Sequence, residues 1–145
     1  MVAKQIEVEV GGNSARFVLR EDLAPKATHA LWESLPIEGP LTHGKLSGEA
    51  CFLHVHKAPL GELSAQLELA VTSIYRGWMV VHPSPASNRA ELLISYGLAE
   101  YRCPTGREYV TPIAELDGDG TALFSALQRT LTDGQQMVVI RGVER

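Results

Sequence analysis

The sequence predicts a mainly β protein, a closed or nearly closed antiparallel barrel of about eight strands with two helices. Three observations carry this prediction. Short segments in which apolar and polar residues alternate recur along the chain, turn residues separate them, and two other segments carry apolar residues at helical spacing. The length of 145 residues suits one compact domain, and we expect residues 1–145 to form it.

The chain opens with a predicted hairpin. Apolar residues alternate with polar ones over residues 4–10, which indicates a half-buried strand. Gly11-Gly12-Asn13 permits a tight turn, and residues 15–20 fit the returning strand.

A helix is predicted after this hairpin. Pro25 suits a first helical turn, Asp22 lies where a carboxylate favours a helix start, and Pro36 ends the helix. The face expected to be buried consists of Ala27, Ala30, Leu31, Ser34 and Leu35. Two prolines and two glycines within residues 36–44 predict a loop.

The rest of the chain follows the same logic. Further strands are predicted over residues 45–55, with a bend at Gly48, and over 67–71, 78–82, 91–96, 109–116 and 136–141. The second helix follows the turn residues 117–120, carries Leu123, Phe124, Leu127 and Leu131, and ends at Asp133-Gly134. Residues 117–120 look superficially like a calcium loop, but the required downstream Glu is missing.

Composition excludes several classes of partner. Seventeen acidic residues against thirteen Lys and Arg give a net charge of −4 without a dense basic cluster, so we expect no nucleic-acid partner. The chain has no apolar run of membrane-spanning length, and its N-terminal residues alternate, unlike a signal peptide. Cys51 and Cys103 do not support a disulfide framework, and we expect a cytoplasmic protein without a membrane partner.

Five segments share their order and residue types with a known family. They are Arg20 to Thr28, with its Ala-Pro-Lys run, Thr42 to Phe52, Tyr75 to Pro83, Ile94 to Gly97, and Val110 to Ala114. The first resembles the strand-to-helix segment of cyclophilins. Together the five resemble small bacterial cyclophilin-like proteins of unknown function, which implies a cyclophilin-like barrel.

Cyclophilins are peptidyl-prolyl isomerases that use an Arg, a Phe-lined apolar groove and a Gln that holds the peptide. If residues 43–52 correspond to the family's active strand, Gly44 stands at the Arg position, Glu49 at the Phe position and Phe52 at the Gln position. Lys45 adjoins the first of these, but an ammonium does not reproduce the planar fork of a guanidinium. The resemblance therefore implies a barrel without efficient isomerase activity.

The candidate ligand site lies around the same segment. On a strand, Lys45, Ser47 and Glu49 would share one face, either a groove floor or the solvent side. Tyr96 is added because Gly97 after it permits close backbone approach. We expect a groove bordered by Lys45, Glu49, Phe52 and Tyr96, with His43 beside it, to bind a small molecule or short peptide without a cofactor.

Two further interpretations remain open. One is an enzyme, either a degenerate isomerase or a hydrolase that uses His43, His54, His56 or His82 with Glu49. A metal site built on His54 and His56 would need His82, His43 or Cys51 as a third ligand, and we expect no metal. The other is a structural subunit, for which we expect a homodimer.

Overall fold

The computed structural model describes residues 3–64 and 67–143. Its elements in chain order are β1 (Gln5–Val10), β2 (Asn13–Leu19), α1 (Pro25–Ser34), β3 (Ile37–His43), β4 (Gly48–Val55), η1 (Leu60–Glu62), β5 (Ser73–Ile74), β6 (Trp78–Ser84), η2 (Pro85–Ser87), β7 (Arg89–Glu100), β8 (Arg102–Cys103), β9 (Gly106–Arg107), β10 (Thr111–Asp117), α2 (Thr121–Asp133) and β11 (Gln136–Gly142).

Eight strands close into an antiparallel barrel. The order around the wall is β4-β3-β11-β1-β2-β10-β6-β7, and β7 pairs with β4 to close it. The short strand β5 pairs with the C-terminal end of β7, and β8 pairs with β9 in a separate hairpin. The predicted fold class, a mainly β closed antiparallel barrel with two helices, is confirmed.

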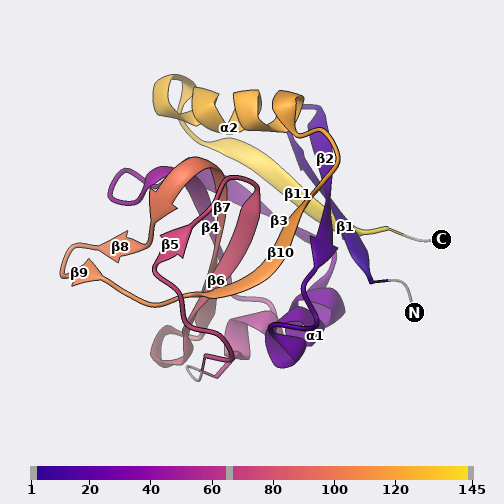
Figure 1. Ribbon diagram of the computed structural model, residues 1–145, viewed down its shortest axis with the longest axis vertical. Helices are drawn as coiled ribbons and strands as arrows, with labels where there is room; N and C mark the ends of the chain where they lie inside the picture. Colours follow the sequence, from indigo (N-terminus) through magenta and orange to yellow (C-terminus); the bar gives the residue numbers. More distant parts are fainter. Residues whose placement is uncertain (1–2, 65–66, 144–145) are drawn as a thin grey trace.

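The helices lie at opposite ends of the barrel (Figure 1). Helix α1 buries Ala27, Thr28, Ala30, Leu31 and Ser34, nearly the face that helical spacing predicts. Its first free backbone amides, on Lys26 and Ala27, donate to the carboxylate of Glu68 at 2.9 and 2.8 Å. Asp22 does not take that role, because it pairs with Arg20 at 2.8 Å. Neither helix is long and apolar enough to cross a membrane in the part of the chain described.

Strand alternation divides the side chains between two cores. Residues that point into the barrel form the main core, among them Phe17, Leu92 and Ile94, all fully buried. Outward residues of β4, β6 and β7, among them Leu93 and Val80, pack with Ile74, Tyr101 and Val110 in a second, smaller core. The barrel wall therefore has apolar side chains along its inner face and a smaller buried apolar cluster on part of its outer face.

Three predictions of local structure are wrong. Residues 37–43, predicted as a loop, form β3. Over residues 37–41 this strand pairs with β11, and only Thr42 and His43 pair with β4. Pro40, which has no backbone N–H to donate, is therefore tolerated, because no hydrogen bond to β4 is needed at that position. Strand β4 starts at Gly48, because the turn over residues 44–47 is closed by a hydrogen bond from the Ser47 amide to the Gly44 carbonyl. The alternation at 67–71 yields only an isolated bridge between Val71 and Val110.

Candidate functional site

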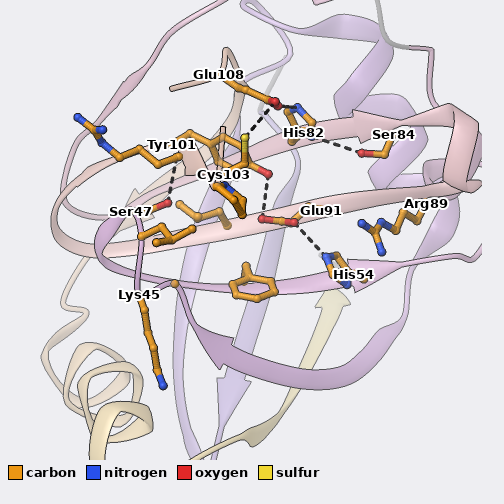
Figure 2. A pocket seen from close by; sticks show the side chains of 16 residues that line it. Lys45, Ser47, His54, His82, Ser84, Arg89, Glu91, Tyr101, Cys103 and Glu108 are labelled. Carbon is orange, nitrogen blue, oxygen red and sulfur yellow. Dashed lines mark hydrogen bonds and ion pairs between the residues drawn. The ribbon is translucent and has the colours of Figure 1, made fainter. Parts of the chain in front are cut away.

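A pocket of about 400 Å³ opens on the outside of the barrel wall, and we call it the wall pocket. Its floor comes from β4, β6 and β7, and its rim from the turn at 44–47 and the segment 101–108 (Figure 2). The lining residues are Gly44, Lys45, Leu46, Ser47, Phe52, His54, His82, Ser84, Arg89, Glu91, Leu93, Tyr101, Arg102, Cys103, Pro104 and Glu108.

The floor consists of aligned rows across three strands. Opposed residues on neighbouring antiparallel strands point to the same face. The pairing places Leu93 between Phe52 and Val80, which makes an apolar row. The next outward row lies two residues before Leu93 on β7 and consists of His54, Glu91 and His82. An apolar strip therefore lies beside a strip of titratable groups.

Glu91 is the centre of one hydrogen-bonded group. Its Oε2 accepts from His54 Nε2 at 3.0 Å, and its Oε1 accepts from the Tyr101 hydroxyl at 3.0 Å. Burial, followed by the negative charge of Glu91, raises the pKa of Tyr101 well above its ordinary value. Tyr101 therefore stays a neutral donor that fixes the carboxylate.

His82 is the centre of a second group. Its Nε2 lies 2.6 Å from Glu108 Oε2, and its ring stacks on Tyr101 with 4.9 Å between centroids. The Ser84 hydroxyl lies 3.4 Å from Nδ1, on the other side of the ring. The thiol of Cys103 donates to Glu108 Oε1 at 3.2 Å, so this carboxylate holds two partners.

Two cations at the wall pocket have no partner among the described residues. Neither Lys45 nor Arg89 forms a hydrogen bond or ion pair there, whereas Arg102 pairs with Glu100 at 2.9 Å. In Figure 2 the side chain of Lys45 extends away from Glu91, and Arg89 lies on the side of His54. Arg89 is therefore the cation best placed to meet an anionic group beside the titratable row.

The structure separates the residues expected to border one groove. Lys45 and Phe52 line the wall pocket. Glu49 does not, because its Oε1 accepts from the Leu98 amide at 3.2 Å and lies beside Gly97. Lys45 belongs to the turn rather than the strand, so the expected alignment of Lys45, Ser47 and Glu49 on one face is wrong.

His43 and Tyr96 face the barrel interior instead. His43 Nε2 and the Tyr96 hydroxyl share a hydrogen bond of 2.7 Å, and their rings meet edge to face. Burial, followed by the charge of Lys45, lowers the pKa of His43 below its ordinary value, while Glu49 acts in the opposite direction. Burial raises the pKa of Tyr96. The two side chains form a neutral pair inside the wall.

The residues weighed for a metal site do not converge. His54 turns to Glu91, and Cys51 lies in the core, where its thiol contacts Thr130 and burial raises its pKa to about 11. Within residues 3–64 and 67–143, no group of three or more His, Cys, Asp or Glu side chains is placed to hold a metal ion.

Four important residues of the wall pocket were absent from the predicted set. Ser84, Arg89, Glu91 and Glu108 come from β6, β7 and the segment after β9. A partial signal was present, because Glu91 is the polar first residue of the strand predicted over residues 91–96 and Leu92 follows it. Alternation could place it on the outer face, but only strand register could bring it to His54 and His82.

The fold and the site define a class of protein, a small closed antiparallel barrel with a polar pocket on the outside of its wall. The chain belongs to the protein family of unknown function DUF3830, whose model matches residues 6–140. The search of curated proteins found no match.

Solved structures share the fold. McbB, solved in complex with tryptophan, superposes with a TM-score of 0.72 and 18% sequence identity. The match covers 94% of this chain but 44% of McbB, so the chain spans less than half of the length of that protein. The hypothetical protein AF2241 from Archaeoglobus fulgidus gives a TM-score of 0.62 and 12% identity over 98% of this chain and 96% of its own. Both likenesses show that these proteins share the barrel fold of this chain.

Proposed function

We propose that this chain is a binding protein for a small polar or peptide-like ligand, held in the wall pocket, without efficient prolyl isomerase activity. The observation that carries the proposal is the pocket itself. Its volume of about 400 Å³ lies in the range of roughly 300–1,000 Å³ common for ligand sites. Apolar and charged groups stand on adjacent rows of its floor.

The lining favours a ligand with an anionic group and an apolar part. Arg89 has no partner within the described residues, so a carboxylate can bind its guanidinium without displacing another ion pair. Phe52 and Leu93 offer apolar surface next to it. Glu91 and Glu108 are already engaged by histidines, and they offer their remaining lone pairs to an ammonium or amide donor.

The comparison with McbB agrees with this choice of ligand. McbB was solved with bound tryptophan, a molecule with a carboxylate, an ammonium and a large apolar side chain. The wall pocket contains groups complementary to all three. Amino acids, their N-acyl derivatives and short peptides are therefore the first ligands to test.

The same pocket supports the part of the proposal that concerns isomerase activity. Gly44 and Phe52, which stand at the Arg and Gln positions of the cyclophilin pattern, both line it. Gly44 has no side chain, and Arg102 on the rim is paired with Glu100. We expect a protease-coupled assay on a prolyl peptide to show no acceleration above the uncatalysed rate, and measurable acceleration would contradict this half of the proposal.

The binding test uses ligand-induced thermal shifts to find a ligand and titration calorimetry to compare its affinity for three variants. Phe52→Ala and Arg89→Gln remove the apolar surface and the free cation, and we expect each to weaken binding at least tenfold in titration calorimetry. Arg16→Gln is the control, because Arg16 is exposed on β2 and lies outside the wall pocket. Binding that survives both pocket variants, or no thermal shift from any ligand class, would contradict the proposal.

The bacterial origin, the cytoplasmic location and the homodimer stay predictions. Light scattering at several protein concentrations tests the last of these directly.

A further inference from the structure

Ser84, His82 and Glu108 form a connected array at the edge of the wall pocket (Figure 2). His82 and Ser84 lie two residues apart on β6, so both side chains point to the outer face. The carboxylate of Glu108 lies 2.6 Å from His82 Nε2, which is an ion-pair contact. The Ser84 hydroxyl lies 3.4 Å from Nδ1 on the other side of the ring. Because a carboxylate only accepts, we assign the ring proton to Nε2, which leaves the Nδ1 lone pair for the Ser84 hydroxyl.

The imidazole is held in place from two directions. Glu108 fixes its edge, and the Tyr101 ring stacks on its face at an interplanar angle of 15°. Tyr101 is itself held by the hydrogen bond from its hydroxyl to Glu91. A fixed ring needs little reorganisation before it accepts a proton from Ser84. The distance of 3.4 Å is long, but catalytic hydrogen bonds are often long before substrate binds and shorten in the complex.

An unpaired cation stands next to the hydroxyl. Arg89 is the residue opposed to Ser84 in the β6–β7 ladder. Opposed residues on one face have Cβ atoms roughly 4.5–5.5 Å apart. The guanidinium is thus within reach of an oxygen that becomes negatively charged on a carbon bonded to Ser84 Oγ.

From this geometry we infer that the wall pocket hydrolyses an acyl ester of its ligand, with Ser84 as nucleophile, His82 as general base and Arg89 as the cation that stabilises the oxyanion. Glu108 and Tyr101 are positioning residues. The inference rests on the proposed function, which it deepens by naming a substrate class. In serine proteases Nε2 faces the serine and Nδ1 faces the carboxylate, whereas here Nδ1 faces Ser84 and Nε2 faces Glu108. The order of nucleophile, imidazole base and carboxylate is the same.

Each step balances. Ser84 Oγ forms a bond to the ester carbonyl carbon while its proton moves to His82 Nδ1, and the carbonyl oxygen becomes an anion beside Arg89. The carbon–alkoxide bond then breaks, and Nδ1–H protonates the departing alkoxide. Water, the co-reactant, attacks the acyl-serine with His82 as base, which releases the carboxylic acid and returns the proton to Ser84.

Other candidate nucleophiles lack the same support. The Cys103 thiol donates to Glu108 rather than to an imidazole. The Ser47 hydroxyl accepts from the Arg102 amide at 3.2 Å. Within residues 3–64 and 67–143, Ser84 is the serine whose hydroxyl contacts a histidine in the pocket.

The first experiment is labelling of the full chain with a short-chain alkyl fluorophosphonate, followed by peptide mass spectrometry. Attack by Ser84 forms an oxygen–phosphorus bond and expels fluoride. We expect labelling on the peptide that contains Ser84, its loss in Ser84→Ala, and its retention in Ser14→Ala, an exposed serine on β2 outside the wall pocket. Labelling that is absent, or unchanged in Ser84→Ala, would overturn the inference.

The second experiment measures hydrolysis of p-nitrophenyl acetate. General acid–base catalysis contributes roughly 10²–10⁴-fold, so we expect Ser84→Ala and His82→Gln each to lower kcat/KM at least a hundredfold. For Glu108→Gln we expect about a tenfold loss with a displaced pH profile, which a purely structural role would not cause. A rate independent of Ser84 and His82 would also overturn the inference.

These outcomes separate the inference from the function on which it rests. Ligand-induced thermal shifts that depend on Arg89 and Phe52, without labelling of Ser84, would leave the binding function standing and remove the hydrolysis. Labelling of Ser84 without any thermal shift would support the reactive serine and remove the proposed ligand class. Circular dichroism of each variant confirms that the barrel is intact.

Discussion

Two histidine sites on opposite sides of the same barrel wall have contrasting surroundings. His43 points inward, shares its proton with the hydroxyl of Tyr96, and is 7% exposed. His82 points outward and pairs with the carboxylate of Glu108, with 23% of its side chain exposed. The interior provides a neutral partner because a buried charge is costly, whereas the outer face tolerates carboxylates that water partly screens.

This difference indicates where chemistry belongs in the fold. Proton transfer creates charge. The inner partner of His43 is the neutral hydroxyl of Tyr96, whereas the outer partner of His82 is the carboxylate of Glu108. Burial already lowers the pKa of His43, so the interior pair resists protonation. We therefore assign stability to the inner face and binding to the outer one, and the following variants test that division.

The largest expected contrast is between two phenylalanines. Phe17 is fully buried inside the barrel, and Phe17→Ala should lower the free energy of unfolding by about 3–5 kcal/mol. Phe52 is half-buried on the wall pocket, and Phe52→Ala should cost about 1–2 kcal/mol. Urea unfolding with an unchanged m-value measures both. Equal losses would contradict the division between the two faces.

The next contrast is between two tyrosine hydroxyls. Tyr96→Phe removes the hydrogen-bond partner of His43 Nε2, and Nδ1 has no partner among the described residues, so we expect a loss of about 1–3 kcal/mol. Tyr101→Phe leaves Glu91 with His54 as a partner, and we expect about 1 kcal/mol. Chemical unfolding of both variants decides the order, and a larger loss from Tyr101→Phe would reverse our assignment.

The same two faces explain what the sequence could and could not predict. Alternation depends only on neighbouring residues, so it correctly predicted the first hairpin, the closed barrel and the inward apolar positions. It failed at β3 because Pro40 and Gly39 are turn residues by propensity, and pairing with β11 outweighs that preference.

The candidate site was less accessible to sequence reasoning. Phe52 and Lys45 were predicted and do line the wall pocket, because both lie near the chain turn that forms its rim. Glu49 and Tyr96 were expected beside them, but β4 starts only after the turn and shifts register between Gly48 and Ala50. Glu108 meets His82 through the segment that crosses the outer wall, and no local pattern encodes a contact across that distance.

A smaller effect is expected from the outer histidine that contacts Glu91. His54 is partly exposed and its ion pair is open to solvent, so His54→Gln should change the free energy of unfolding by less than about 1 kcal/mol. The matched interior variant His43→Gln should cost more, since it disturbs a buried hydrogen bond. Parallel urea titrations compare them, and the reverse order would show that the outer row also supports the fold.

The smallest expected effect is the pH dependence that the interior pair contributes. Because the pKa of folded His43 lies below the ordinary value of 6.5, the unfolded chain takes up this proton first as the pH falls. The stabilisation is therefore complete above pH 6.5 and declines on acidification. The carboxyls with lowered pKa, Asp22 and Asp119, respond at lower pH, and the raised pKa values of Cys51 and Tyr96 act at higher pH. Unfolding free energies measured between pH 7.5 and 5.5 should fall in the wild-type chain and fall less in His43→Gln, whereas identical slopes would show that the interior histidine is not the group that titrates.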